Sequence, residues 1–410
     1  MKPALAGLAL ALAAALPGAS DGQPLRLHGV AYGAFREGQS PNTGVFPAPE
    51  QIAEDLAQLA TFTDRIRTYS VENTQGDILA LARAEKLELY AGAWVGSDAH
   101  ANDVEIARLL ALARRAKPAV LVVGNEAVAP EKLSAEALIL LIQRVDVASK
   151  LPVAYADTWS QWLAHPEVAE AVDVLLVHIH PYWDGVPVQD AASYVLARFE
   201  QVKQRYPTKR VVIGETGWPK AGATVGAAVP GESQQCQFLR DFVTRATNRG
   251  APYFWFSAYD EAWKKDASGH EAEAHWGLGS AERNLEPCIE AFLATPPPLI
   301  EITNTARCGA GSNSHGGLRG RVFGLSETNR MDHRVVLFAE TNTWYVQPFI
   351  SSPFTPFGSK GTWKRGTHLG NRYAALLVTR AYDPPATTNE LPEIGRGVVA
   401  IGTQDCGRSK

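Results

Sequence analysis

The chain has little cysteine, no surplus of charge and, beyond its first residues, no long apolar run. Its 410 residues include four cysteines, and 39 Lys and Arg nearly balance 43 Asp and Glu, which leaves a net charge of −4. This balance argues against a nucleic-acid partner, which calls for a basic surface. The cysteine spacings do not resemble a zinc site, and no later segment is apolar for the roughly 20 residues of a membrane-spanning helix. We therefore expect a soluble mature chain.

The only long apolar run lies at the N-terminus. Met1, Lys2 and Pro3 precede the apolar residues 4–16, and small residues follow at 18–20. This pattern is typical of a cleavable signal peptide and is too short for a membrane anchor. We predict that residues 1–20 are removed and that the mature protein is secreted or periplasmic.

Export makes the cysteines informative, because an even number in an oxidising compartment favours disulfides. Cys308 and Cys406 would join the two ends of the C-terminal segment, and this is the favoured pair. Cys236 and Cys288 either form a second disulfide or remain buried thiols.

Short apolar runs alternate with helical periods between residues 25 and 293. Eight of the runs read as strands, and they lie at residues 27–32, 65–69, 88–94, 120–124, 152–155, 173–179, 210–214 and 253–257. Eight strand–helix repeats over about 270 residues match a (β/α)8 TIM barrel. An open doubly wound sheet would alternate in the same way, but the chain has no glycine-rich dinucleotide turn. We predict that residues 24–295 form the barrel domain.

The pattern changes after the barrel. Residues 296–300 contain three consecutive prolines and predict a stiff linker. Beyond them, short apolar runs are separated by Gly, Pro, Asn and Ser, so we predict that residues 301–410 form a small all-β sandwich of uncertain role. Trp344, Tyr345 and Trp363 belong either to its core or to a sugar-binding platform.

Two glutamates follow two of the predicted barrel strands. Glu126 ends the run VLVVGNE, and Glu215 ends the run RVVIGE. Residues just past such strands lie at the catalytic face of a barrel. One such Glu alone would be read as a surface acid, whereas two predict a site formed by two distant strands. Paired carboxylates there are typical of glycoside hydrolysis, and a separation of about 5–5.5 Å would indicate retention of configuration.

Other strand ends contribute polar and aromatic side chains around this pair. We expect Arg67 to keep Glu215 ionised, burial to raise the pKa of Glu126, and Asn125 to donate to a sugar 2-hydroxyl. Further candidates for substrate binding, several of them with flat rings suited to stacking on pyranoses, are Tyr32, Tyr69, His180, Tyr182, Trp183, Trp218, Tyr259 and Trp263.

A His-x-His pair, His178 and His180, lies on one face of the sixth predicted strand. The pair has the spacing of two metal ligands, but no third ligand with suitable spacing presents itself. Histidines of the substrate site or of the core are the favoured interpretation, and we predict no metal and no cofactor.

Four motifs stand in order along the barrel at the ends of strands two, four, seven and eight. They are IRTY (66–69), GNEA (124–127), GETGWP (214–219), and DEAWK (260–264) with EAHWGL (273–278). Together they resemble the signatures of family 17 glycoside hydrolases, the β-1,3-glucanases, over roughly residues 25–290. The sixth strand, HIHPY (178–182), is closer to fungal and bacterial members than to the plant endo-enzymes.

The resemblance implies a role for each matched residue. Glu126 would be the acid/base and Glu215 the nucleophile, while Glu261, Lys264 and Glu273 would support the acid/base side of the site. It also implies a retaining β-1,3-glucan hydrolase that needs no cofactor and has β-glucan as its partner, and we expect a monomer. A glucanosyltransferase with the same glutamates, a non-catalytic glucan-binding protein, and a barrel glycosidase for β-1,4-glucan or mannan remain open.

Overall fold

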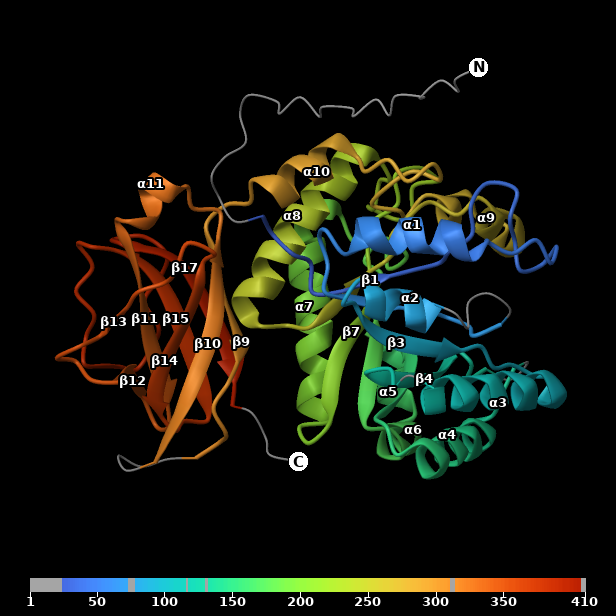
Figure 1. The fold of residues 1–410 in the computed structure, drawn as a ribbon, viewed down its shortest axis with the longest axis horizontal. Coiled ribbons are helices and arrows are strands. Elements are labelled where there is room, and N and C mark those ends of the chain that lie inside the picture. The colour runs from blue at the N-terminus through green and yellow to red at the C-terminus, as the bar shows by residue number, and fades with distance from the viewer. Residues whose placement is uncertain (1–23, 73–77, 116, 130–131, 310–313, 407–410) are drawn as a thin grey trace, which may run out of the picture.

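The computed structural model describes residues 24–72, 78–115, 117–129, 132–309 and 314–406. It consists of a closed barrel and an antiparallel β-sandwich that lie side by side (Figure 1). The predicted signal peptide, residues 1–20, lies outside the described residues. Among the described helices, none combines the length and the apolar character needed to cross a membrane.

All eight predicted barrel strands are confirmed, in sequence order around one closed parallel sheet. Each strand is buried along most of its length, as the continuous apolar runs indicated. The strands are β1 (Val30–Ala31), β2 (Arg65–Arg67), β3 (Glu88–Ala93), β4 (Val120–Asn125), β5 (Val153–Thr158), β6 (Val174–His178), β7 (Arg210–Thr216) and β8 (Tyr253–Trp255).

Helices cover the outside of the barrel through apolar stripes. In α1, for example, Ile52, Leu56 and Leu59 are fully buried at the spacing of one helix face. The helices are α1 (Pro49–Leu59), α2 (Ile78–Ala84), α3 (Ala99–Arg115), α4 (Ala135–Ser149), α5 (Trp159–Ala164), α6 (Pro166–Ala171), α7 (Val188–Arg205), α8 (Glu232–Arg249), α9 (Trp263–Ser268), the 3₁₀ helix η2 (Glu271–Ala274) and α10 (Pro287–Ala294).

The C-terminal region is a two-sheet sandwich, as predicted. One sheet has the order β14-β10-β9, and the other β16-β12-β11-β15-β17 with β13 paired to β11. One apolar cluster, including Ile300, Leu318, Leu337 and Leu377, joins the two sheets, and a second, including Val336 and Phe338, lies on the other face of the larger sheet. The elements are β9 (Leu299–Asn304), β10 (His315–Phe323), α11 (Glu327–Arg330), β11 (His333–Glu340), β12 (Trp344–Gln347), β13 (Phe354–Thr355), β14 (Thr362–His368), β15 (Arg372–Thr379), β16 (Thr387–Thr388) and β17 (Val398–Asp405).

The aromatic residues of the sandwich divide between core and surface. Trp344 and Trp363 are only 4% and 3% exposed, whereas Tyr345 is 38% exposed. Trp363 belongs to the cluster between the two sheets and Trp344 to the cluster on the other face of the larger sheet, so the two do not form a flat exposed platform with Tyr345.

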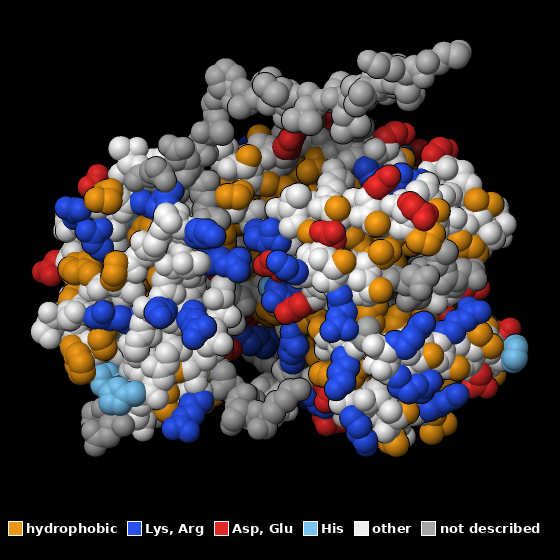
Figure 2. Space-filling view, viewed as in Figure 1, with side chains coloured by type: hydrophobic (Ala, Val, Ile, Leu, Met, Phe, Trp, Pro, Cys, Tyr) orange, Lys and Arg blue, Asp and Glu red, His pale blue; other side chains and the backbone are white. Residues whose placement is uncertain are grey.

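The sandwich packs against the outer helices of the barrel. Strands β9 and β17 contact α8, and Lys203 on α7 forms an ion pair of 2.7 Å with Asp405. A second ion pair joins Arg321 of β10 to Asp64 at 3.7 Å. Basic and acidic side chains are mixed along this boundary on the face shown in Figure 2. The sandwich thus rests on the side of the barrel.

Both disulfides considered from the sequence are present. Cys236 on α8 is bonded to Cys288 on α10, and Cys308 after β9 is bonded to Cys406 after β17. The first disulfide attaches the last barrel helix to its neighbour. The second closes the sandwich, and its cysteines are 98 positions apart in sequence.

Candidate active site

The two glutamates lie at the carboxyl ends of β4 and β7. Glu126 directly follows β4 and has φ of 48°, in the left-handed region that residues with a side chain rarely adopt. Glu215 lies within β7 and is 5% exposed. The motif glycine after it is required by packing, because a Cβ on Gly217 would lie 2.0 Å from the carbonyl oxygen of Phe256. Backbone strain of the kind seen at Glu126 clusters at functional sites.

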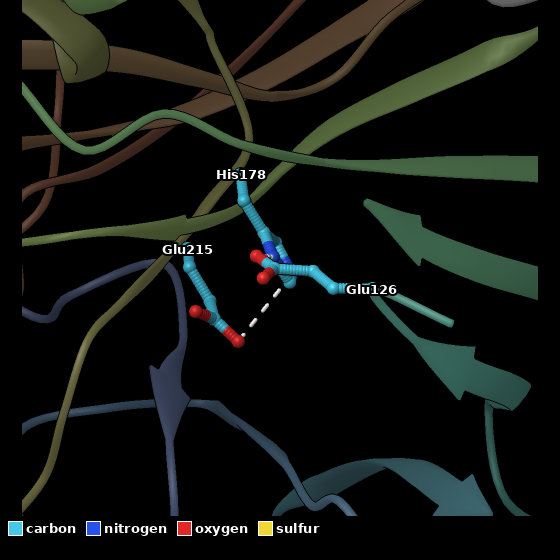
Figure 3. Close-up of side chains that lie close together, drawn as sticks. All are labelled: Glu126, His178 and Glu215. Atoms are coloured by element: carbon cyan, nitrogen blue, oxygen red, sulfur yellow. Dashed lines mark hydrogen bonds and ion pairs between the residues drawn. The ribbon is translucent and has the colours of Figure 1, made fainter. Parts of the chain in front are cut away.

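The two carboxylates approach each other closely. One oxygen of Glu126, one of Glu215 and a ring nitrogen of His178 lie within 4.8 Å of one another. Figure 3 shows the three side chains converging from their separate strands. The nearest oxygens of the two carboxyl groups are therefore no more than 4.8 Å apart.

Arg67 connects four strands through one guanidinium group. It is 1% exposed, and its Nη1 donates to the Gly214 carbonyl at 2.9 Å and to Oε1 of Glu215 at 3.1 Å. The same nitrogen lies 2.8 Å from Nε2 of His178, and Nη2 donates to Oδ1 of Asn125 at 2.5 Å. Because this bond occupies the amide oxygen of Asn125, its NH2 group is the part left for a ligand.

His178 is a bridge between the two glutamates. A guanidinium carries only donors, so Nε2 of His178 accepts from Arg67 and the ring proton lies on Nδ1. Nδ1 therefore donates to Oε1 of Glu126 at 2.6 Å. Nε2 lies 3.3 Å from Oε1 of Glu215. The ring thus holds Glu126 directly, and it is linked to Glu215 through Arg67, whose Nη1 donates to both Nε2 of the ring and Oε1 of Glu215.

The three clustered ligand atoms also have a spacing suited to a cation, but their chemistry does not fit one. Nδ1 of His178 carries a proton, and its Nε2 already accepts from Arg67. The buried guanidinium beside Glu215 supplies the positive charge that a metal would bring. The residues fit a hydrogen-bonded carboxylate pair.

Glu215 is held as a carboxylate by its neighbours. Tyr69 donates to Oε1 at 2.8 Å, and Nε2 of His180 lies 3.2 Å from Oε2. Burial acts to raise the pKa of Glu215, but His178, His180 and Arg67 outweigh burial and hold this pKa well below its ordinary range. The expectation that Arg67 helps to keep Glu215 ionised is consistent with this balance.

Glu126 departs from expectation. Burial acts to raise its pKa, as predicted, but the hydrogen bond from His178 outweighs burial and lowers the pKa below its ordinary value of 4.5. The side chain of Glu126 is also 41% exposed, so it remains in contact with water. The prediction of a raised pKa was wrong, because it considered burial and not the imidazole partner.

The loop after β8 brings charged residues to the same side of the barrel mouth. Glu261 is 3% exposed, and its Oε2 pairs with Nζ of Lys264 at 2.6 Å. That Nζ also lies 5.6 Å from the ring centre of Tyr69 and 4.7 Å from that of Phe256. Since Tyr69 donates to Glu215, the loop and the β7 carboxylate share one neighbour.

Glu273, in η2, completes this group. Burial raises its pKa; Lys264 and His180 oppose this, while the charges of Glu215 and Glu126 add to it. The three predicted supporting residues Glu261, Lys264 and Glu273 therefore gather at the mouth.

Two predicted substrate-binding tyrosines belong to a different network. Tyr32 donates to Oδ2 of Asp55 at 2.9 Å, and Tyr259 donates to Oε1 of Gln58 at 2.5 Å. Both are 1% exposed, and their rings meet edge to face at 6.5 Å. The structure places them in the wall between β1, β8 and α1.

The aromatic residues after β6 and β7 form a cluster that is largely buried. Trp218 is fully buried and donates from Nε1 to the Val229 carbonyl at 3.0 Å. Tyr182 is 1% exposed, and its ring lies 5.9 Å from that of Trp218. These two rings pack inside the loops, whereas Trp183 and Trp263 are half-buried.

Trp94 was not among the predicted substrate-site residues, and His178 was assigned either to the substrate site or to the core. The His-x-His spacing could have marked His178, but its contacts with two distant strands depend on barrel closure. Trp94 follows β3 and is 55% exposed. The strand alternation that puts Tyr90 in the barrel interior carries Trp94 to the same side, at the open mouth.

The barrel and the carboxylate pair at its mouth define the class as a barrel glycoside hydrolase. Residues 29–277 match the family described as the BtgE/BtgC glycoside hydrolase domain. The chain belongs to this family, which bears out the resemblance to glucan-active hydrolases of the family 17 type.

Curated relatives cover the barrel part of the chain. Glucan endo-1,3-beta-glucosidase btgC of Emericella nidulans is 29% identical over 277 residues, which are 60% of this chain and 42% of that protein. The probable glucan endo-1,3-beta-glucosidase btgC of Aspergillus fumigatus is 30% identical over 279 residues, which are 60% of this chain and 40% of that protein. The chain thus spans less than half the length of these relatives.

Solved structures show the same fold. The family 17 β-1,3-glucanosyltransferase of Rhizomucor miehei is 27% identical, with a TM-score of 0.57 over 64% of this chain and 96% of that chain. An active-site mutant of that enzyme was solved in complex with laminaritriose. An endo-laminarinase from Formosa Hel1_33_131, at 22% identity and a TM-score of 0.55 over 64% of this chain and 85% of that chain, shares the fold.

Replacing Arg67 by Ala should destabilise the barrel strongly. The change leaves the buried carboxylate of Glu215 and the amide oxygen of Asn125 without their donor, which costs about 3–5 kcal/mol for a buried ion pair. Urea denaturation measures the free energy of unfolding. Arg65→Ala is the matched control on the same strand, since its partner Glu88 is 54% exposed and such pairs contribute about 0–1 kcal/mol. Equal losses in the two variants would contradict the central role of Arg67.

Proposed function

We propose that the protein is a secreted, retaining β-1,3-glucan hydrolase that acts by double displacement. The observation that carries the proposal is the approach of Glu126 and Glu215 to within 4.8 Å. With one oxygen of each so near, the pair fits the roughly 5–5.5 Å carboxyl separation of a retaining enzyme better than the wider separation of an inverting one, which favours a covalent glycosyl intermediate. Relatives named as glucan endo-1,3-beta-glucosidases support β-1,3-glucan as the substrate.

In the first step, Oε of Glu215 attacks the anomeric carbon as the glycosidic C–O bond breaks. Glu126, protonated when substrate is bound, gives its proton to the leaving oxygen. Glu215 suits the nucleophile role because its neighbours keep it ionised. Tyr69 and His180 hold its two oxygens in place.

In the second step, Glu126 takes a proton from a water that attacks the anomeric carbon and releases Glu215. Glu126 suits this double role because its side chain is 41% exposed and can reach both the leaving group and water. Asn125 supports the sugar: its oxygen is held by Arg67, and its NH2 group is free to donate to the 2-hydroxyl.

Glucan chains need apolar faces beyond the reacting bond. Trp94, exposed at the end of β3, and the half-buried Trp183 and Trp263 offer such faces around the mouth. Secretion is part of the proposal and rests on the predicted signal peptide and on the two disulfides.

Replacing Glu215 by Ala should abolish turnover of laminarin. Loss of a covalent nucleophile lowers kcat by more than about three orders of magnitude. Release of reducing sugar from β-1,3-, β-1,4- and β-1,6-glucans, by wild type and variant, measures both the loss and the linkage. Glu88→Ala, at the amino end of β3, is the control and should keep full activity. Binding of laminarin by wild type without release of sugar would instead indicate a non-catalytic glucan-binding protein.

A glucanosyltransferase is the second candidate, favoured by the similarity to the Rhizomucor miehei enzyme. The same glutamates would serve, with a sugar hydroxyl in place of water. Incubation of wild type with laminaritetraose and chromatography of the early products separates the two activities. Hydrolysis gives only shorter products, and products longer than the substrate would replace the hydrolase proposal by transfer.

Replacing His178 by Ala should move the alkaline limb of the pH–rate profile to higher pH. Glu126 must be protonated to donate, so kcat/KM falls as pH rises through its pKa in the free enzyme. The bond from His178 lowers that pKa below 4.5, and without the bond the proton is held to higher pH. His165→Ala, which removes a half-exposed histidine on the outer surface, should leave the limb unchanged. A limb that does not move in His178→Ala would contradict this role of His178.

A further inference from the structure

Residues of β5 that take no part in the proposed reaction hydrogen-bond the backbone at and after Glu126. The NH group of Glu126 donates to the Ala156 carbonyl at 2.8 Å. After Glu126 turns into the left-handed region, the next two NH groups, of Ala127 and Val128, donate to one oxygen, the hydroxyl of Tyr155, at 2.9 and 3.2 Å. A left-handed residue with a side chain persists only where its surroundings determine it.

Tyr155 contacts the chain on both sides of the Asn-Glu pair. Its ring borders Gly124, where an added Cβ would lie 3.2 Å from the ring edge. Its hydroxyl holds the two NH groups that follow Glu126. The ring itself is 2% exposed and packs edge to face on Trp162 of α5 at 5.5 Å. Tyr155 thus transmits the rigid packing of α5 and β5 to the loop that carries Glu126.

Asp157, two residues further along β5, supports the tyrosine hydroxyl. It is 3% exposed and accepts the proton of the Tyr155 hydroxyl, and its other oxygen accepts from the Thr158 NH at 2.7 Å. It has no ion-pair partner within the part of the chain that the structure describes. The negative carboxylate draws the hydroxyl proton and makes the phenol oxygen a stronger acceptor for the two NH groups.

We propose that Tyr155 and Asp157 are positioning residues that orient the carboxyl group of Glu126 for its role as acid/base. This inference rests on the proposed function of Glu126. A burial role alone would be met by Phe at position 155, which fills the same space. The hydroxyl of Tyr155 is needed to accept from the two backbone NH groups, and Asp157 is needed to accept the proton of that hydroxyl.

The test uses two substrates that differ in their need for acid catalysis. Laminaritetraose has a poor leaving group that Glu126 must protonate, whereas 2,4-dinitrophenyl β-laminaribioside releases a phenolate that needs no proton. kcat/KM reports the steps up to formation of the glycosyl-enzyme, so it isolates this need. Tyr155→Phe and Asp157→Asn are measured on both substrates with the full chain.

In Tyr155→Phe we expect kcat/KM on laminaritetraose to fall by about tenfold to a hundredfold, part of the 10²–10⁴-fold that general acid catalysis contributes. On the dinitrophenyl substrate it should stay within about threefold of wild type. Asp157→Asn should show the same selectivity with a smaller loss, because Asn keeps an acceptor for the hydroxyl. Equal losses on the two substrates, or no loss on either, would overturn the inference.

Tyr206→Phe is the matched control. It also removes a buried tyrosine hydroxyl from the barrel, one that donates to the Trp162 carbonyl of α5 and does not touch the loop of Glu126. It should match Tyr155→Phe in thermal unfolding and keep the wild-type kcat/KM on both substrates. If the wild type cleaves neither substrate, the proposed function itself fails, which is a different result from a loss confined to the variants.

Discussion

One buried guanidinium holds the centre of the barrel mouth together. Arg67 leaves β2 and donates to groups of β4, β6 and β7, so four of the eight strands meet at one side chain. A buried cation is stable only where acceptors surround it, and here these acceptors are the groups that also shape the site. The guanidinium can only donate, so Nε2 of His178 accepts from it and the ring proton lies on Nδ1. Nδ1 then donates to Glu126. Arg67 thus takes part in positioning both carboxylates, Glu215 directly and Glu126 through His178.

The sequence predicts the barrel and the two glutamates at its mouth because both follow from local sequence patterns. A run such as 210–214 is apolar enough to indicate a buried strand by itself, and eight such runs in alternation leave few alternatives to a closed barrel. Glu126 and Glu215 each end one of these runs. Their proximity follows from barrel closure, since the carboxyl ends of all parallel strands lie on one face.

What could not be predicted depends on contacts between strands. The lowered pKa of Glu126 comes from His178, 52 residues away in sequence. Trp218 belongs to a motif typical of sugar sites, yet it is fully buried. Its indole NH donates to the Val229 carbonyl in a loop, and no local sequence pattern identifies this partner. Trp94 has no motif around it, and only the completed barrel shows that its ring lies exposed beside the mouth.

The site contains more acids than permanent cations, and this imbalance bears on how the acid/base obtains its proton. Glu126, Glu215, Glu261 and Glu273 gather around the mouth, and the loop after β8 brings Lys264 to the same group. Arg67 adds one more positive charge, and it is directed to Glu215. Burial raises the pKa of Glu273, and the charges of Glu215 and Glu126 add to this rise, whereas the side chain of Glu126 remains exposed to water. In the proposed mechanism, a bound sugar covers the mouth and displaces that water, so the charge on Glu126 loses its solvation and protonation of Glu126 becomes favourable. The lowered pKa of Glu126 in the free protein is thus compatible with an acid role, because substrate burial supplies the missing desolvation.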